Sequence, residues 1–132
     1  MRVRSSLLDA RAVGAGAVLA IVIALPAALV GEAAADGEDD PSALVLLTFV
    51  VVLLGFVAGG WLAARRAPDA PFSNGAVAAL AAFTVIQLGG VIANVIQDDP
   101  VHGASIAFSA LLAIASGLVG AIVATRRSAP PS

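Results

Sequence analysis

The 132-residue chain contains no cysteine, no lysine and no tyrosine, and it has only one histidine and one tryptophan. Without cysteine it has no disulfide and no thiolate for catalysis or metal binding. Charged residues make up 12% of the chain, against about 25% in an average soluble domain. Hydrophobic residues make up 60%, and the mean hydropathy is +1.01. A soluble fold of this size could not bury so much apolar surface, so we expect lipid to surround most of the chain.

Four apolar segments are each long enough to cross a membrane as a helix, because a hydrocarbon core of about 30 Å needs about 20 helical residues. We expect an all-α, integral membrane four-helix bundle that forms a single domain over 1–132, with a turn at 67–74 and a disordered cytoplasmic tail at 126–132. Pro26 predicts a kink in the first span and no break. The predicted spans are 12–31, 43–64, 75–97 and 104–125.

The N-terminus allows a second interpretation. The basic head, the apolar run and Ala33-Ala34-Ala35 are also typical of a signal peptide that is cleaved after Ala35. The apolar run, however, is longer than the usual signal-peptide core of about 7–15 residues. We therefore expect a retained first span.

The charges are divided between the two sides of the expected bundle. All seven arginines lie at the N-terminus, after the second span or at the C-terminus, whereas seven of the nine acids lie in the other two loops. Cytoplasmic loops carry the excess of arginine and lysine in membrane proteins. We expect both termini to be cytoplasmic in a multi-pass protein of the bacterial cytoplasmic membrane. The pairs that set this topology, and that can contact anionic lipid headgroups, are Arg65, Arg66, Arg126 and Arg127.

The second half of the chain repeats landmarks of the first half. A shift of 59 residues places Gly16 on Gly75 and Asp39-Asp40-Pro41 on Asp98-Asp99-Pro100. A later shift of 62 places Gly55 on Gly117 and Arg65 on Arg127. The chain is thus predicted to be two tandem transmembrane hairpins that form a parallel internal repeat.

Small residues are expected to bring these helices together, because backbones approach closely in lipid only where side chains are small. Gly55 and Gly59 form a G-x-x-x-G pair, and Ser116 and Gly120 form a similar pair. Packing within the chain is the first interpretation, and a homo-oligomer interface is the second. The predicted packing residues are Gly55, Gly59, Gly60, Gly90, Gly117 and Gly120.

The third span carries the polar side chains Thr84, Gln87 and Asn94, whose spacing places them on one helix face. If the next turn is centred on 101–102, Gln87 lies opposite Ser116 and Asn94 lies opposite Ser109. The sequence thus predicts a polar seam between the third and fourth spans. The seam is interpreted as hydrogen bonding between helices, and a path for a solute is the alternative.

Little in the sequence predicts catalysis. No nucleophile–base pair, phosphate-binding loop or H-E-x-x-H motif is found. His102 stands near Asp98 and Asp99, but one histidine and two aspartates predict only a weak metal site. We expect no enzyme, no cofactor, no metal and no nucleic-acid partner. The expected partners are the lipid bilayer and either a second copy of the chain or another membrane protein.

The segment Gly59-Gly60-Trp61-Leu62-Ala63-Ala64-Arg65-Arg66, followed by Gly75 at the start of the next span, resembles a pattern in small four-helix bacterial integral membrane proteins of actinobacterial type. That resemblance implies the topology described above and no assigned activity. The function that we expect is a non-catalytic structural or accessory subunit. The alternative is a channel or transporter subunit for small solutes that works as an oligomer.

Overall fold

The computed structural model describes residues 8–37, 42–98 and 103–128, which are helical almost throughout. All four helices are long and apolar enough to cross a membrane. This confirms the all-α four-helix fold and indicates an integral membrane protein. The helices are α1 (Ala10–Gly37), α2 (Ser42–Arg66), α3 (Pro71–Ile96) and α4 (Gly103–Ser128).

The helix bounds differ from the predicted spans at three places. α1 extends to Gly37, beyond the predicted end at 31, and it continues through Pro26 without a break, as expected. α3 begins at Pro71 and not at Gly75, because a proline fits the first helical turn, so Asn74 belongs to the helix and not to a turn. α4 continues to Ser128, so residues 126–128 of the predicted disordered tail are helical. Residues 129–132 and most of the two acidic turns lie outside the described residues.

A hydrogen bond joins the start of α1 to the start of α3. The Asp9 Oδ1 atom accepts from the backbone N–H groups of Arg11, at 2.9 Å, and Ala12, at 3.2 Å, so Asp9 caps α1. The Asn74 side chain is fully buried. Its Oδ1 accepts from the Asp9 backbone N–H at 2.8 Å, and its Nδ2 donates to the Ala70 carbonyl at 2.8 Å. Asn74 therefore fixes the beginning of α1 to the beginning of α3.

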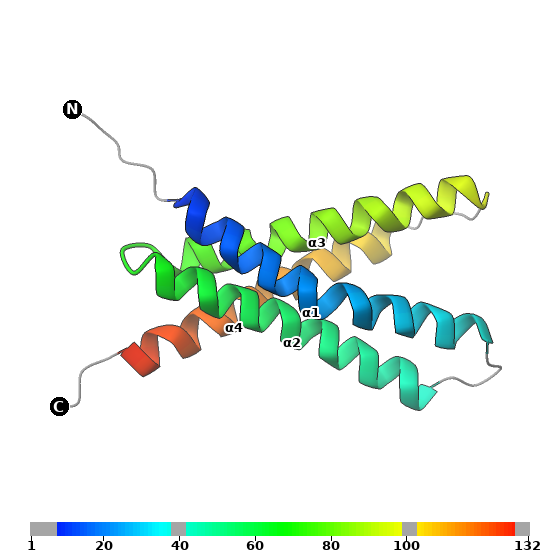
Figure 1. Ribbon diagram of the computed structural model, residues 1–132, viewed down its shortest axis with the longest axis horizontal. Coiled ribbons are helices and arrows are strands. Elements are labelled where there is room, and N and C mark those ends of the chain that lie inside the picture. Colours follow the sequence, from blue (N-terminus) through cyan, green and yellow to red (C-terminus); the bar gives the residue numbers. More distant parts are fainter. Residues whose placement is uncertain (1–7, 38–41, 99–102, 129–132) are drawn as a thin grey trace.

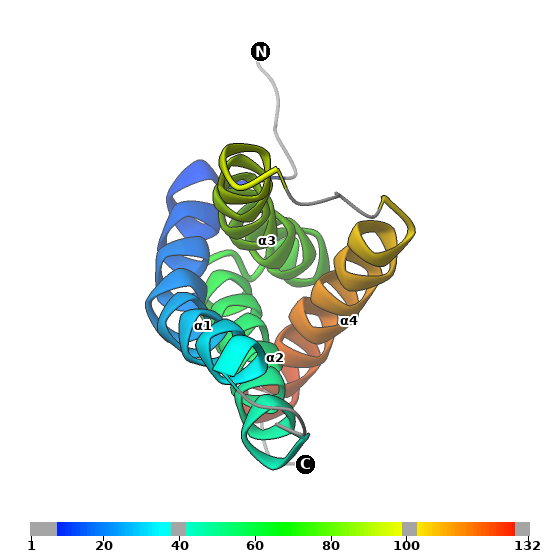
Figure 2. The same cartoon turned by 90° about the vertical axis from the view of Figure 1, so that its right-hand side faces the viewer.

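The bundle is narrow at one end and open at the other. The start of α1, the turn between α2 and α3, and the end of α4 all lie toward the narrow end, on the left in Figure 1. α2 and α3 contact each other and both remaining helices, whereas α1 and α4 do not meet within the described residues. Figure 2 faces the open end, where α3 and α4 stand apart.

The crossings at the narrow end use a G-x-x-x-A pair from each helix. A Cβ atom added to Gly59 would lie 2.5 Å from the Gly16 carbonyl oxygen and 2.7 Å from the Ala20 Cβ. Only glycine permits so close an approach of the two backbones. The four pairs are Gly16 and Ala20, Gly59 and Ala63, Gly75 and Ala79, and Gly117 and Ala121.

The second hairpin repeats this contact. A Cβ atom added to Gly117 would lie 2.6 Å from the Gly75 carbonyl oxygen and 2.7 Å from the Ala79 Cβ. The two crossings agree with the predicted internal repeat of hairpins. They also correct its alignment, because in packing Gly117 corresponds to Gly59, one helical turn from the predicted Gly55.

The same end joins the two hairpins. A Cβ atom added to Gly60 would lie 2.6 Å from the Gly117 Cα, and one added to Gly120 would lie 2.6 Å from the Trp61 backbone nitrogen. We call this region the glycine end; it comprises Gly16, Gly59, Gly60, Gly75, Gly117 and Gly120.

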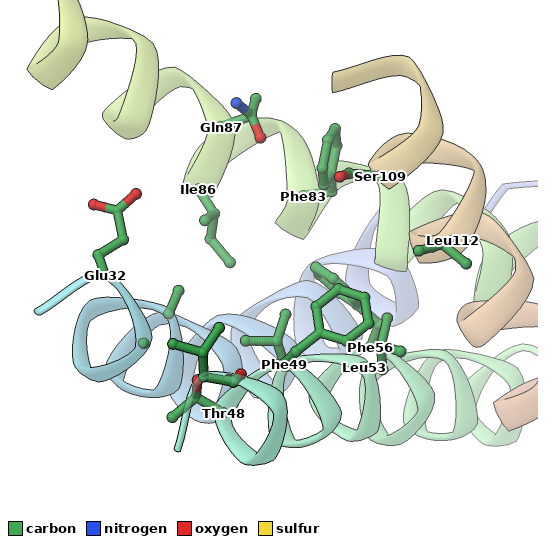
Figure 3. A pocket seen from close by; sticks show the side chains of 14 residues that line it. Glu32, Thr48, Phe49, Leu53, Phe56, Phe83, Ile86, Gln87, Ser109 and Leu112 are labelled. Carbon is green, nitrogen blue, oxygen red and sulfur yellow. Dashed lines mark hydrogen bonds between the residues drawn. The ribbon is translucent and has the colours of Figure 1, made fainter. Parts of the chain in front are cut away.

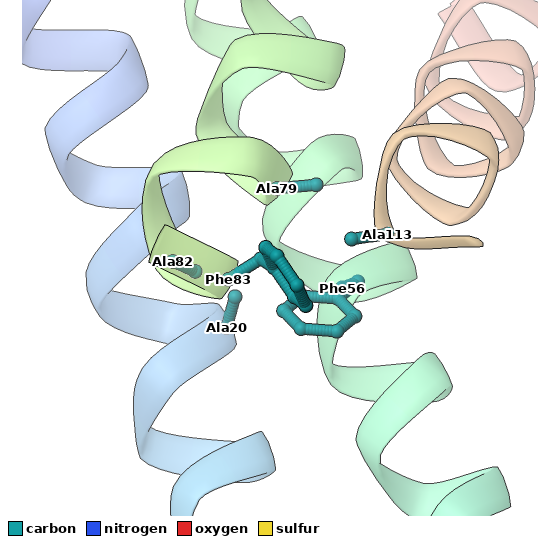
Figure 4. Packing of buried hydrophobic residues seen from close by; sticks show 6 residues of the cluster. All are labelled: Ala20, Phe56, Ala79, Ala82, Phe83 and Ala113. Atoms are coloured by element: carbon teal, nitrogen blue, oxygen red, sulfur yellow. The ribbon is translucent and has the colours of Figure 1, made fainter. Parts of the chain in front are cut away.

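A small core lies next to the glycine end. Phe56 and Phe83 meet edge to face, with ring centroids 6.5 Å apart and an interplanar angle of 63°. Alanines from α1, α3 and α4 surround the two rings (Figure 4). The side chains of this core are Ala20, Phe56, Ala79, Ala82, Phe83 and Ala113.

Replacing a glycine of the crossing tests this account of the packing. Gly117→Ala places a methyl group against the Gly75 backbone, and we expect it to lower the free energy of unfolding by about 1–3 kcal/mol. Gly14→Ala is the matched control, because no atom lies within 4 Å of the added Cβ. It should leave stability unchanged or raise it by up to about 1 kcal/mol. Unfolding by SDS titration in mixed micelles measures both, and equal stabilities would contradict the close-contact account.

Candidate functional site

Beyond the core, the open end contains a cavity of about 410 Å³ that is lined by all four helices. The two hairpins form its opposite walls, and the Phe56–Phe83 pair lies toward the glycine end (Figure 3). Its lining is mostly aliphatic and aromatic. The polar side chains among the lining residues are Glu32, Thr48, Gln87 and Ser109.

The cavity exists because the two hairpins differ in their outer halves. In the first hairpin, a Cβ atom added to Gly55 would lie 3.1 Å from the Ala24 backbone nitrogen, and one added to Gly31 would lie 2.5 Å from the Thr48 Oγ1. Small residues thus keep α1 and α2 together well beyond the glycine end. In the second hairpin, Gly89 and Gly90 have no atom within 4 Å of an added Cβ. α3 and α4 therefore meet at the glycine end and diverge beyond it.

The predicted polar seam is not formed in the expected register. Gly75 and Ala79 meet Gly117, whereas the predicted pairing placed Gly117 roughly two turns further along α3. The expectation assumed helices that run alongside each other from a turn at 101–102. The real helices cross at their glycines and then separate. Gln87 and Ser109 consequently line the same cavity.

The hydroxyl and amide groups of the seam do not bridge the two helices. The Thr84 hydroxyl donates to the Leu80 carbonyl of its own helix at 2.8 Å. Asn94 and Ser116 are half-buried. Among the described residues, no hydrogen bond joins Thr84, Gln87 or Asn94 to Ser109 or Ser116. Gln87 and Ser109 line the recess, whereas Thr84, Asn94 and Ser116 are not among its lining residues. The polar groups of the seam therefore do not hold the two helices together.

The predicted packing glycines fall into two groups. Five of them lie at helix contacts: Gly55, Gly59, Gly60, Gly117 and Gly120. Gly90 does not, because α4 has moved away from it, and the expectation for that residue is corrected. The expected pair of Ser116 with Gly120 is also replaced, since Gly117 and Ala121 form the crossing with α3 while Gly120 faces Val57 and Trp61 of α2.

Three contact glycines, Gly16, Gly31 and Gly75, are missing from the predicted packing set, as is Asn74. Gly16 and Gly75 were visible in the repeat, and each begins a G-x-x-x-A spacing. The spacing alone does not identify contacts, because it also occurs at Gly89, where an added Cβ meets no atom within 4 Å. Asn74 gave no such signal, because a single amide near a predicted turn is common.

The two arginine pairs lie at the ends of α2 and α4. Arg65 and Arg66 end α2, and both are exposed. The Arg65 guanidinium carbon lies 5.2 Å from the centroid of the Trp61 ring, which is a cation–π contact. Arg126 is exposed in the last turn of α4, and Arg127 follows it in the helix. Contact of these side chains with lipid headgroups stays a prediction.

Within residues 8–37, 42–98 and 103–128, no three histidine, aspartate or glutamate side chains converge on a common point. His102 and Asp99 lie outside these ranges. The site that the described residues form is therefore a mostly apolar recess with a few polar groups, which is the usual composition of a binding site for a small ligand.

Comparison with known proteins finds no family model that matches the chain, and no curated protein or solved structure that matches it. The resemblance to small four-helix bacterial membrane proteins stays a prediction.

Introduced cysteines test the shape of the cavity, since the chain has none of its own. Ser109 lines the cavity, whereas Ala113, one turn further along α4, is fully buried in the core. We expect Ser109→Cys to react with N-ethylmaleimide in the folded protein and Ala113→Cys to remain unmodified. Both should react in SDS. Equal protection of the two cysteines in the folded protein would show that the recess is closed.

Proposed function

We propose that the protein is a non-catalytic accessory or structural subunit of the bacterial cytoplasmic membrane, and that the outer half of α3 binds a helix of another membrane protein. The observation that carries this proposal is the unoccupied surface at Gly89 and Gly90. An added Cβ would meet no atom within 4 Å at either residue.

A glycine pair inside a membrane helix needs a physical reason. Each glycine disfavours a helix by about 1 kcal/mol relative to alanine in a water-soluble host. At the glycine end, close packing offsets that cost. At Gly89 and Gly90 no contact within the described chain does so, and small residues are the usual contact points between membrane helices. Large apolar side chains flank the pair and are exposed: Val85, Leu88 and Ile92.

The alternative function, a channel or transporter subunit for small solutes, is favoured by the cavity. Within a single chain, however, the glycine end closes the inner side of the cavity. There the backbones of α2, α3 and α4 approach closely at Gly60, Gly75 and Gly117. A path across the membrane would then have to run between copies of the chain. This alternative therefore requires an oligomer.

Native mass spectrometry after gentle detergent extraction tests the proposed subunit role. We expect the unmodified chain to be recovered in a defined complex with a second membrane protein. Combined Gly89→Leu and Gly90→Leu should abolish the complex with less than about 1 kcal/mol lost from the stability of the chain, because both positions are open and leucine favours a helix.

Gly14→Leu is the matched control, since Gly14 is equally open but lies on α1; it should leave the complex intact. A monomer, or a complex that survives the double substitution, would contradict the proposal. A symmetric homo-oligomer would favour the solute-handling alternative.

The proposed orientation places the glycine end at the cytoplasm, because the arginines gather there. Asp69→Cys in the turn at that end and Asp98→Cys at the open end provide two single-cysteine reporters. In spheroplasts, a membrane-impermeant maleimide should label Asp98→Cys at once and Asp69→Cys only after the membrane is permeabilised. The reverse order of labelling would show that the glycine end faces the outside, and it would contradict the proposed topology.

A further inference from the structure

We propose that the cavity at the open end binds an amphiphilic organic cation, with its apolar groups between the two hairpins and its charge near the Glu32 carboxylate. This inference goes beyond the proposed subunit role and does not depend on it, because the cavity belongs to a single chain.

The size and the lining of the cavity determine the class of ligand. A volume of about 410 Å³ lies within the range of small-molecule sites, roughly 300–1,000 Å³. The walls carry Leu53, Ile86 and Leu112, which suit hydrocarbon or aryl groups (Figure 3). A small hydrated ion would gain nothing from such walls, since apolar surface favours apolar ligands.

The charge of the ligand follows from Glu32. Among the described residues it is the only charged one that lines the cavity, and it reaches the cavity from α1, across from Gln87 on α3 (Figure 3). The described arginines all lie at the other end of the bundle. Glu32 is exposed, at the edge of an apolar recess and away from the described basic groups, and a carboxylate there attracts cations and repels anions. Fatty acids and anionic lipid headgroups are therefore disfavoured.

The aromatic residues strengthen the preference for a cation. Phe49, Phe56 and Phe83 all line the cavity. The faces of aromatic rings attract organic cations, and quaternary ammonium groups are recognised in this way by many proteins. Glu32 thus attracts the positive charge at the outer part of the cavity, while Phe56 and Phe83, which lie toward the glycine end, offer aromatic surface to the apolar body of the ligand.

Calorimetric titration of the full chain in nanodiscs of phosphatidylcholine tests the inference. Tetraphenylphosphonium is the probe, and tetraphenylborate is its control of the same shape and opposite charge. After subtraction of empty nanodiscs, we expect saturable binding of the cation and at least about tenfold weaker binding of the anion.

Three variants test whether the cation binds in the cavity and near Glu32. Glu32→Gln should weaken cation binding by about tenfold. Asp98→Asn removes one charge from the same end of the bundle without touching the cavity, so it should change the affinity less than about twofold. Ala28→Trp fills the cavity while Glu32 remains, and it should abolish binding.

Circular dichroism confirms that each variant is folded. Equal binding of the borate, unchanged binding by Glu32→Gln, or binding that persists in Ala28→Trp would each overturn the proposal. Failure of the proposed subunit role would show differently, as a monomer in native mass spectrometry that still binds the cation.

Discussion

The structure depends on the approach of one peptide backbone to another at four G-x-x-x-A motifs. In lipid no hydrophobic effect drives helices together, so the contact must come from van der Waals packing at short range. Glycine removes the side chain that would hold two helices apart, and the alanine one turn later packs against the neighbouring backbone. The Gly16–Gly59 and Gly75–Gly117 crossings use the same arrangement, and Gly60 places the two hairpins against each other.

The number of helices, their approximate limits and the pairing of hairpins are predictable from the sequence, because each rests on long apolar runs or on repeated landmarks. The register of α3 against α4 is not, since it depends on which small residues meet, and α4 offers Ser116, Gly117 and Gly120 within five positions. A one-turn error in the repeat alignment and a displaced polar seam both follow from this ambiguity. The role of Asn74 was equally hidden, because its partner is a backbone N–H 65 residues away.

The cavity is also a consequence of register. Divergence of α3 from α4 cannot be read from hydropathy, because exposed and buried faces of these helices are about equally apolar in lipid. Because the crossing lies at Gly75 and Gly117, Gln87 and Ser109 have a different structural role from the predicted one. They are predicted as residues of a helix interface. In the structure they are polar residues on one wall of a recess, and Glu32 lines the wall formed by the other hairpin.

The hydrogen bond between Asn74 and the start of α1 has a mechanical consequence. Together with the glycine contacts, it fixes the relative position of the two hairpins at one end of the bundle only. At the open end, no hydrogen bond joins the described residues of one hairpin to those of the other. The glycine end is therefore the pivot about which the two hairpins can rotate relative to each other. A small rotation about this pivot leaves the pivot contacts intact and changes the width of the recess most strongly near Glu32.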